Sequence, residues 1–257
     1  MKLNKPNFWD YKKPNFLAYI LLPLTFPILI RNFFAKSFSK EKFHKIKTVC
    51  VGNIYLGGTG KTPLSIKINN LLKAQGLKST VVKKFYNDQS DEQSLIKNYT
   101  NLICKKNRLD ALNDAINQKF EFAIFDDGLQ EKSINYDLKI VCFTNSQWKG
   151  NGFIIPAGPL REKIESLKNF DIVFINGDPK KNQDILNEIK KLNNNINIFE
   201  TFYKPSNLKE FDNNLNYVAF TGIGNPENFY NIMIENKFKI IKKFSFPDHY
   251  TYSSNDL

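Results

Sequence analysis

From residue 46 onward, the apolar positions of the chain fall into short runs separated by stretches with helical spacing. The first run, 46–51, is rich in β-branched residues and leads into a glycine-rich turn. In the next stretch, 61–75, apolar residues recur with helical spacing up to Gly76, which predicts a helix. Further strands are predicted at 79–82, 101–104, 122–125, 138–143, 172–175 and 217–220, and further helices at 108–118, 183–192 and 226–235.

Strands that alternate with helices predict an α/β fold. The helices connect parallel strands and cover the sheet, so we expect a mostly parallel sheet with helices on both faces. A tract rich in Lys and Asn, from 180 to 197, is low in complexity and marks a domain boundary. The pattern therefore predicts a core at 46–180 and a smaller C-terminal α/β lobe at 181–257.

The first 45 residues follow a different pattern. Residues 16–30 carry no charge and are flanked by Lys12, Lys13 and Arg31. As a helix they would span about 22 Å, which is shorter than the ~30 Å hydrocarbon core of a bilayer, and two prolines would kink them. No small-residue cleavage site follows, so a signal peptide is not indicated. Two interpretations remain: a hydrophobic anchor helix that dips into a membrane, and a buried helix of the globular domain.

Composition and charge narrow the class of protein. A chain of 257 residues with 42% hydrophobic content can bury a core, which excludes a disordered tail. The net charge is +12, of which residues 1–50 carry +8, so the excess is concentrated at the N-terminus. No recognition motif supports nucleic-acid binding. The three cysteines lack metal-ligand spacing and lie in or beside apolar runs, which predicts reduced core residues of a cytosolic protein.

The sequence GGTGKT at 57–62 lies between a predicted strand and a predicted helix, where a P-loop is found. Glycines let backbone N–H groups point at phosphate oxygens, Lys61 reaches the β- and γ-phosphates, and Thr62 offers a hydroxyl to Mg²⁺. The general pattern G-x-x-x-x-G-K-[ST] has glycine at position 55, where this chain has tyrosine. The predicted nucleotide-binding residues are Tyr55, Leu56, Gly57, Gly58, Thr59, Gly60, Lys61 and Thr62.

An acidic pair supplies the second part of a nucleotide site. The predicted strand 122–125 ends in Asp126 and Asp127, and P-loop enzymes hold their metal with an acidic residue at the end of such a strand. Together the two motifs predict a P-loop NTPase-like fold that binds ATP and Mg²⁺. Arginine is scarce, so Arg161 and Arg108 are further candidates for binding phosphate bidentately.

Five longer strings remain: VGN at 51–53 before GGTGKTP, DDGLQ at 126–130, PAGPLRE at 156–162, GIGNPENF at 222–229 and FPDHY at 246–250. In these strings and their order the chain resembles the tetraacyldisaccharide 4'-kinase family. The resemblance covers the chain from about residue 9 and implies transfer of the ATP γ-phosphate to the 4'-hydroxyl of an acylated glucosamine disaccharide 1-phosphate, giving lipid IVA. It also implies a lipid substrate, a membrane surface as partner, and a peripheral or shallowly anchored location at the cytoplasmic face of the bacterial inner membrane.

Individual roles follow from the same resemblance. It implies that Asp91 is the catalytic acid, that His249 is its partner, and that Lys61 and Arg161 complete the catalytic set. The implied metal-binding residues are Thr62, Asp126, Asp127, Gln130 and Glu162.

The chain also departs from the family pattern. The family's S-R-G-Y segment reads Lys83-Lys84-Phe85-Tyr86, Glu131 replaces a histidine, and Gln93 replaces a proline. We expect a shortened C-terminal lobe, because relatives continue past the position of Leu257. Two other function classes stay open. The first is a P-loop NTPase that couples hydrolysis to a partner, although a guanine-reading N-K-x-D motif is absent. The second is a nucleotide-binding paralogue without catalysis.

Overall fold

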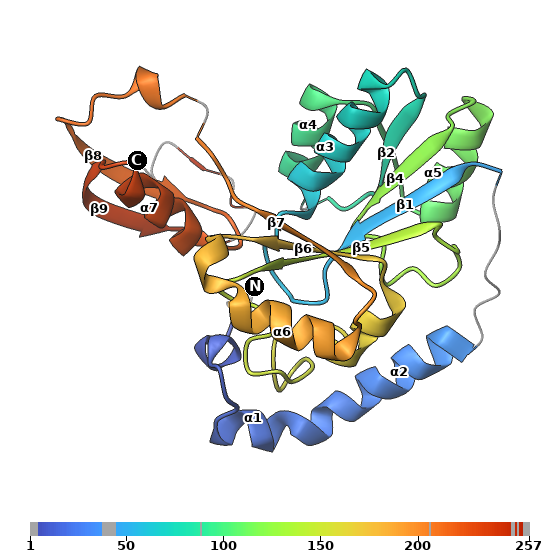
Figure 1. Ribbon diagram of the computed structural model, residues 1–257, viewed down its shortest axis with the longest axis horizontal. Coiled ribbons are helices and arrows are strands. Elements are labelled where there is room, and N and C mark those ends of the chain that lie inside the picture. The colour runs from blue at the N-terminus through green and yellow to red at the C-terminus, as the bar shows by residue number, and fades with distance from the viewer. Residues whose placement is uncertain are drawn as a thin grey trace. The chain divides into compact units, whose positions relative to one another are not determined.

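The computed structural model describes residues 5–37, 45–87, 89–205, 207–247, 250, 252 and 253. By its internal contacts the chain divides into two compact units. The larger unit is Pro6–Thr201, and the smaller unit contains the residues that follow Thr201 together with Lys5 (Figure 1). Every candidate site residue except His249 belongs to the larger unit.

A parallel sheet of seven strands forms the centre of the larger unit, counting the described residues (Figure 1). Along the chain, the strands after β1 first build one side of the sheet, and β5 to β7 then build the other side. The strand order therefore reverses at β1, and ligands of open α/β sheets bind beside such a reversal. In spatial order the strands are β3 (Leu102–Lys105), β2 (Ser79–Lys84), β4 (Phe122–Asp126), β1 (Lys47–Gly52), β5 (Leu138–Thr144), β6 (Ile172–Asn176) and β7 (Asn197–Thr201).

Helices cover both faces of this sheet, as predicted. Alternate residues of a strand point to opposite faces, and β1 shows this clearly. Val49 and Val51 pack with apolar residues of α3 (Lys61–Ala74), while Cys50 belongs to the larger core cluster that includes α5 (Arg108–Asn117) and α6 (Gln183–Leu192). The fourth helix, α4 (Ser90–Tyr99), adds Ile96 to a small cluster with α3 and β2.

The predicted strands and helices are present, but one α-helix and two strands of the described residues were not predicted. Helix α4 has few apolar positions, so its sequence carries no clear helical stripe. Strands β7 and β9 expose most of their side chains, so neither shows alternating apolar positions. Cys50 and Cys142 are buried free cysteines, as predicted for core residues, whereas Cys104 is only partly buried.

The smaller unit contains a β-α-β arrangement. Strands β8 (Asn216–Thr221) and β9 (Lys239–Ser245) pair in parallel, and α7 (Pro226–Glu235) connects them. Tyr230 of α7 is buried and donates a hydrogen bond of 2.6 Å to the Phe244 carbonyl. The sequence-based boundary at 180 lies before α6 and β7, yet both pack with the larger unit because β7 pairs with β6.

The apolar N-terminal segment forms consecutive helices, not one kinked helix. Helix α1 (Phe16–Leu21) leads into a 3₁₀ turn (Leu22–Thr25) and then into α2 (Phe26–Ser37). Pro23 lies in the 3₁₀ turn, and Pro27 lies in the first turn of α2, where a missing N–H removes no helical bond. Within the described ranges, none of the helices has the length and apolar character needed to cross a bilayer.

Candidate active site

The P-loop follows β1 at the point where the strand order reverses. Its glycines adopt backbone conformations that other residues avoid: φ is 141° at Gly57 and 86° at Gly60. Gly60 directly precedes α3, so Lys61 and Thr62 form the first turn of that helix. Backbone N–H groups in this first turn lack helical partners and can bind an anion.

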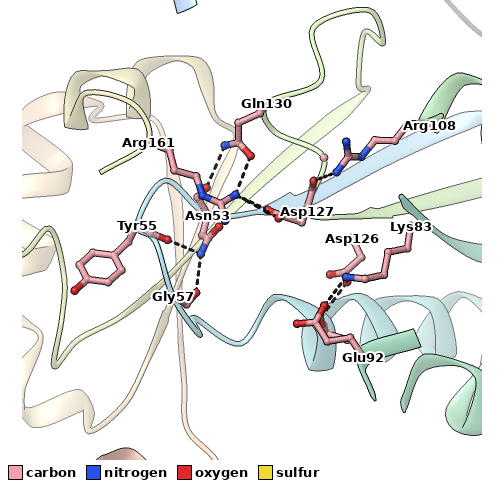
Figure 2. A network of polar contacts seen from close by, with 12 residues as sticks. Asn53, Tyr55, Gly57, Lys83, Glu92, Arg108, Asp126, Asp127, Gln130 and Arg161 are labelled. Carbon is pink, nitrogen blue, oxygen red and sulfur yellow. Dashed lines mark hydrogen bonds and ion pairs between the residues drawn. The ribbon is translucent and has the colours of Figure 1, made fainter. Parts of the chain in front are cut away.

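Buried polar groups shape the interior of the loop. Asn53 is fully buried, and its side-chain amide donates to the carbonyls of Tyr55 (2.6 Å) and Gly57 (3.0 Å), as Figure 2 shows. The hydroxyl of Thr59 is also buried, and it has no hydrogen-bond partner among the described residues. Such groups are rare in folded proteins, and this hydroxyl could donate to a phosphate oxygen.

Strand register brings Asp126 next to the P-loop. In the parallel sheet Asp126 aligns with Val51 on one side and with Lys83 on the other. The carboxylate is fully buried and accepts hydrogen bonds from the hydroxyls of Thr62 (3.0 Å) and Ser65 (3.2 Å). Because the Thr62 hydroxyl donates its proton to Asp126, the lone pairs of its oxygen remain for a cation. These oxygen groups fit a hard cation such as Mg²⁺.

Lys83 is a site residue that the sequence analysis did not identify. Its side chain is only 3% exposed, and its ammonium lies 2.8 Å from Asp126 while also pairing with Glu92 (Figure 2). Burial alone would lower the pKa of Lys83, but the charges of Asp126 and Glu92 outweigh it, so the pKa lies above its usual value. A sign of its burial in the sequence is that Lys83 directly follows the apolar residues of β2, whose side chains are buried.

Asp127 is the centre of a second polar network (Figure 2). Its backbone is left-handed, with φ of 58°, and its N–H donates to the Val51 carbonyl at 2.8 Å. One guanidinium nitrogen of Arg161 donates to both carboxylate oxygens, at 3.0 and 3.3 Å, and to the Gln130 side chain at 3.1 Å. Arg108 donates to the Asp127 carbonyl at 2.5 Å.

The charges around Asp127 keep its carboxylate ionised. Burial would raise the pKa of Asp127, but the positive charges of Lys61, Arg161 and Arg108 lower it below its usual value. The charges of Lys61 and of both arginines therefore act on the same carboxylate. Three cations around one carboxylate leave a net positive site beside the phosphate-binding loop, which favours a polyanionic ligand.

The PAGPLRE segment reaches the site by pairing with the P-loop. The N–H of Leu56 donates to the Pro159 carbonyl (2.9 Å), and the N–H of Arg161 donates to the Ile54 carbonyl (2.7 Å). These bonds explain how Arg161, about a hundred residues beyond the loop in sequence, comes to lie beside Asp127. They also link the loop to a second stretch of backbone.

Comparisons with known proteins show which family the chain belongs to. The sequence model of the tetraacyldisaccharide-1-P 4'-kinase family (LpxK) matches residues 18–257. The chain belongs to this family. A tetraacyldisaccharide 4'-kinase of Pelagibacter ubique is 50% identical over 259 residues, which span 100% of this chain and 82% of that protein. The corresponding protein of Rickettsia canadensis is 33% identical, with the same coverage.

A solved structure confirms the fold of the family. The crystal structure of LpxK from Aquifex aeolicus in complex with ATP has a TM-score of 0.68 to this chain at 22% identity. The similarity covers 93% of this chain and 84% of that one. The P-loop NTPase-like fold predicted from the sequence is therefore confirmed.

The other predicted site residues of this family member are placed as follows. Asp91 is exposed in the first turn of α4, next to Glu92. Glu162 forms an ion pair with Lys132 at 3.5 Å. His249 lies outside the described residues. In the part of the chain that the structure describes, no three acidic, His or Cys side chains cluster as a metal site, so Mg²⁺ binding at the predicted residues stays a prediction.

Tyr55, the departure from the general P-loop pattern, points away from the loop interior. Its side chain is fully buried, and its hydroxyl bonds to the Asp10 carboxylate. The tyrosine thus anchors the loop to the N-terminal segment, which a glycine could not do. Tyr55 forms a small core cluster with Ile154 and Leu160, and the partly buried residues packed against this cluster are Ile28, Leu29 and Ile164.

Replacing Tyr55 by glycine restores the general pattern, yet we expect it to destabilise this kinase-family chain. The change removes a buried aromatic ring, which typically costs about 3–5 kcal/mol. Urea unfolding followed by circular dichroism measures the loss. Tyr55→Phe is the control, because it removes only the bond to the charged Asp10, worth about 1.5–3 kcal/mol. An unchanged unfolding free energy in Tyr55→Gly would contradict the anchoring role.

Proposed function

We propose that the chain transfers the γ-phosphate of ATP to the 4'-hydroxyl of a tetraacyldisaccharide 1-phosphate, giving lipid IVA. Two findings together support this proposal. The chain aligns over its whole length with a tetraacyldisaccharide 4'-kinase. In addition, the hydroxyl of the P-loop residue Thr62 donates a hydrogen bond to the buried carboxylate of Asp126, at the end of the neighbouring strand. That arrangement is the phosphate- and metal-binding core of P-loop kinases.

The nucleotide side of the mechanism rests on the P-loop. The N–H groups at the start of α3 and the Lys61 ammonium stabilise the charge on the β- and γ-phosphates. Thr62, supported by Asp126, would hold Mg²⁺, which supplies charge neutralisation at the phosphate oxygens when bound. Arg161 is fixed by Asp127 and Gln130, so its remaining N–H groups can stabilise the phosphoryl group in transfer. No large rearrangement of these cations is then needed during the reaction.

On the acceptor side we propose that Asp91 accepts the proton of the attacking 4'-hydroxyl. A hydroxyl is a weak nucleophile near neutral pH, and a carboxylate within hydrogen-bond reach can take its proton in the transition state. His249 would orient that carboxylate or share the proton. The basis for this pair is the match to the family motif, together with the exposed position of Asp91 at the start of α4.

Lys61→Ala should reduce phosphate transfer by roughly 10²–10³-fold, because it removes a charge that stabilises the transferring phosphoryl group. The assay follows radiolabelled γ-phosphate from ATP to extracted lipid, with free phosphate counted in parallel. Lys67→Ala is the control, since Lys67 lies on the exposed side of α3. Near-normal transfer in Lys61→Ala would contradict the P-loop assignment. Hydrolysis without transfer in the unmodified protein would favour the coupled NTPase, and neither reaction would favour an inactive paralogue.

Asp91→Ala and His249→Ala should each lower kcat far more than the KM for ATP. If the two residues act as a pair, the double variant loses much less than the product of the single losses. Steady-state kinetics of the four proteins measure this coupling. Fully multiplicative losses would show that the residues act independently.

We further propose that the N-terminal segment docks on the cytoplasmic face of the inner membrane, where the acylated acceptor resides. One side of this segment packs on the core: Ala18 is fully buried and Thr25 nearly so. The other side exposes large apolar residues, including Phe16 (78%), Leu24 (57%) and Phe26 (65%). Burying such a side chain in a bilayer is worth about 1.5–3 kcal/mol, and basic neighbours add attraction to anionic lipid.

Replacing Phe16, Leu24 and Phe26 together by asparagine should release the protein from anionic vesicles in a flotation assay. Because these side chains are exposed, the fold should remain intact, and the KM for lipid should rise more than the KM for ATP. A matched control replaces three equally exposed residues elsewhere. They are Tyr99, Phe202 and Ile241. Equal loss of vesicle binding in both triple variants, or in neither, would contradict docking through the N-terminal segment.

A further inference from the structure

A continuous chain of polar contacts runs from the P-loop to the first turn of α4. Thr62 donates to Asp126. Asp126 pairs with the ammonium of Lys83, and Lys83 pairs with Glu92, as Figure 2 shows. The inner part is rigid, because Asp126 is fully buried and Lys83 nearly so. Glu92 is at the outer end, with a quarter of its side chain exposed.

Hydrogen bonds to the preceding segment also hold the start of α4. Gln89, at its N-cap, makes no side-chain capping bond, so the helix start lacks the usual stabilisation. The Gln93 side chain donates to the Tyr86 carbonyl at 2.9 Å, and the backbone N–H of Gln89 donates to the same carbonyl at 3.3 Å. The Lys83–Glu92 pair adds a direct link from this helix start to β2 and, through Asp126, to the P-loop helix, and Asp91 is the neighbour of Glu92 in this turn.

Electrostatics give the lysine a second effect. The ammonium of Lys83 lies between the carboxylates of Asp126 and Glu92 and compensates their repulsion. Removing a buried charge from such a group leaves its partners uncompensated, which is strongly unfavourable. Without Lys83, Glu92 would move toward solvent, and the start of α4 would follow it.

We propose that Lys83 is a positioning residue for the acceptor side of the reaction, holding Glu92 and thereby Asp91 in place relative to the P-loop. This inference rests on the proposed role of Asp91 in the phosphate transfer described above. Lys83 touches neither the nucleotide nor the acceptor in this scheme. It acts through Glu92, and through the fixed carboxylate of Asp126.

The test compares Lys83→Met, Glu92→Gln and the double variant with the unmodified protein. We expect kcat to fall about tenfold in Lys83→Met, a size typical of coupled contacting groups, with a smaller change in the KM for ATP. The double variant should be no worse than Lys83→Met alone, because Glu92→Gln removes the uncompensated charge. Lys105→Met is the matched control: it breaks an exposed ion pair with Asp114 at the end of the neighbouring strand, and such pairs contribute little.

Hydrogen exchange provides a readout that does not depend on activity. Amides of residues 91–94 should exchange faster in Lys83→Met, while the first turn of α3 keeps its protection. Unchanged exchange at 91–94, or unchanged kcat, would overturn the positioning role. If Lys83→Met does not fold, Glu92→Gln carries the same two criteria, since Glu92 is partly exposed. A last outcome separates the two proposals. If the unmodified protein transfers no phosphate, but Lys83→Met still speeds exchange at 91–94, the proposed function is rejected while the role of Lys83 in holding the start of α4 stands.

Discussion

The buried carboxylate of Asp126 is the interaction on which the rest of the site depends. A charge without solvent must be compensated by partners, and here they come from two other elements: Thr62 and Ser65 from α3, and Lys83 from β2. These bonds fix the start of α3 against the ends of β4 and β2. The orientation of the P-loop helix is therefore set by electrostatics as well as by apolar packing.

The P-loop is supported from its other side by the backbone of the PAGPLRE segment. Leu56 and Arg161 form backbone bonds across this pairing, and Tyr55 packs beneath it against α2. The N-terminal helices are thus attached to the nucleotide site itself. An apolar surface that binds lipid would be coupled through Tyr55 to the loop that binds phosphate, so both substrates of the proposed reaction would meet at one rigid part of the molecule.

Both arginines singled out by their scarcity belong to the network around Asp127. The sequence suggested that they bind phosphate directly, and in the structure Arg161 and Arg108 contact the carboxylate and the carbonyl of Asp127. These contacts orient the guanidinium groups and leave other N–H groups for a ligand. Arg108 Nε is buried without a partner among the described residues. A planar fork suits this dual use better than a lysine does.

The sequence by itself determined the P-loop, the acidic strand end, the parallel α/β fold and the family, because each signal is contained in a short contiguous stretch. Only the tertiary structure decided that Lys83 is buried between Asp126 and Glu92, since this lysine resembles the many solvated basic residues among the 37 in the chain. Likewise, whether the Tyr55 side chain points into the P-loop or away from it depends on Asp10, Ile28 and Leu160, which are distant in sequence. Strand β7 belongs to the sheet through pairing with β6, although its exposed side chains give no periodic signal. Local patterns encode backbone geometry, whereas the partners of a charged or aromatic side chain are fixed only when distant segments pack together.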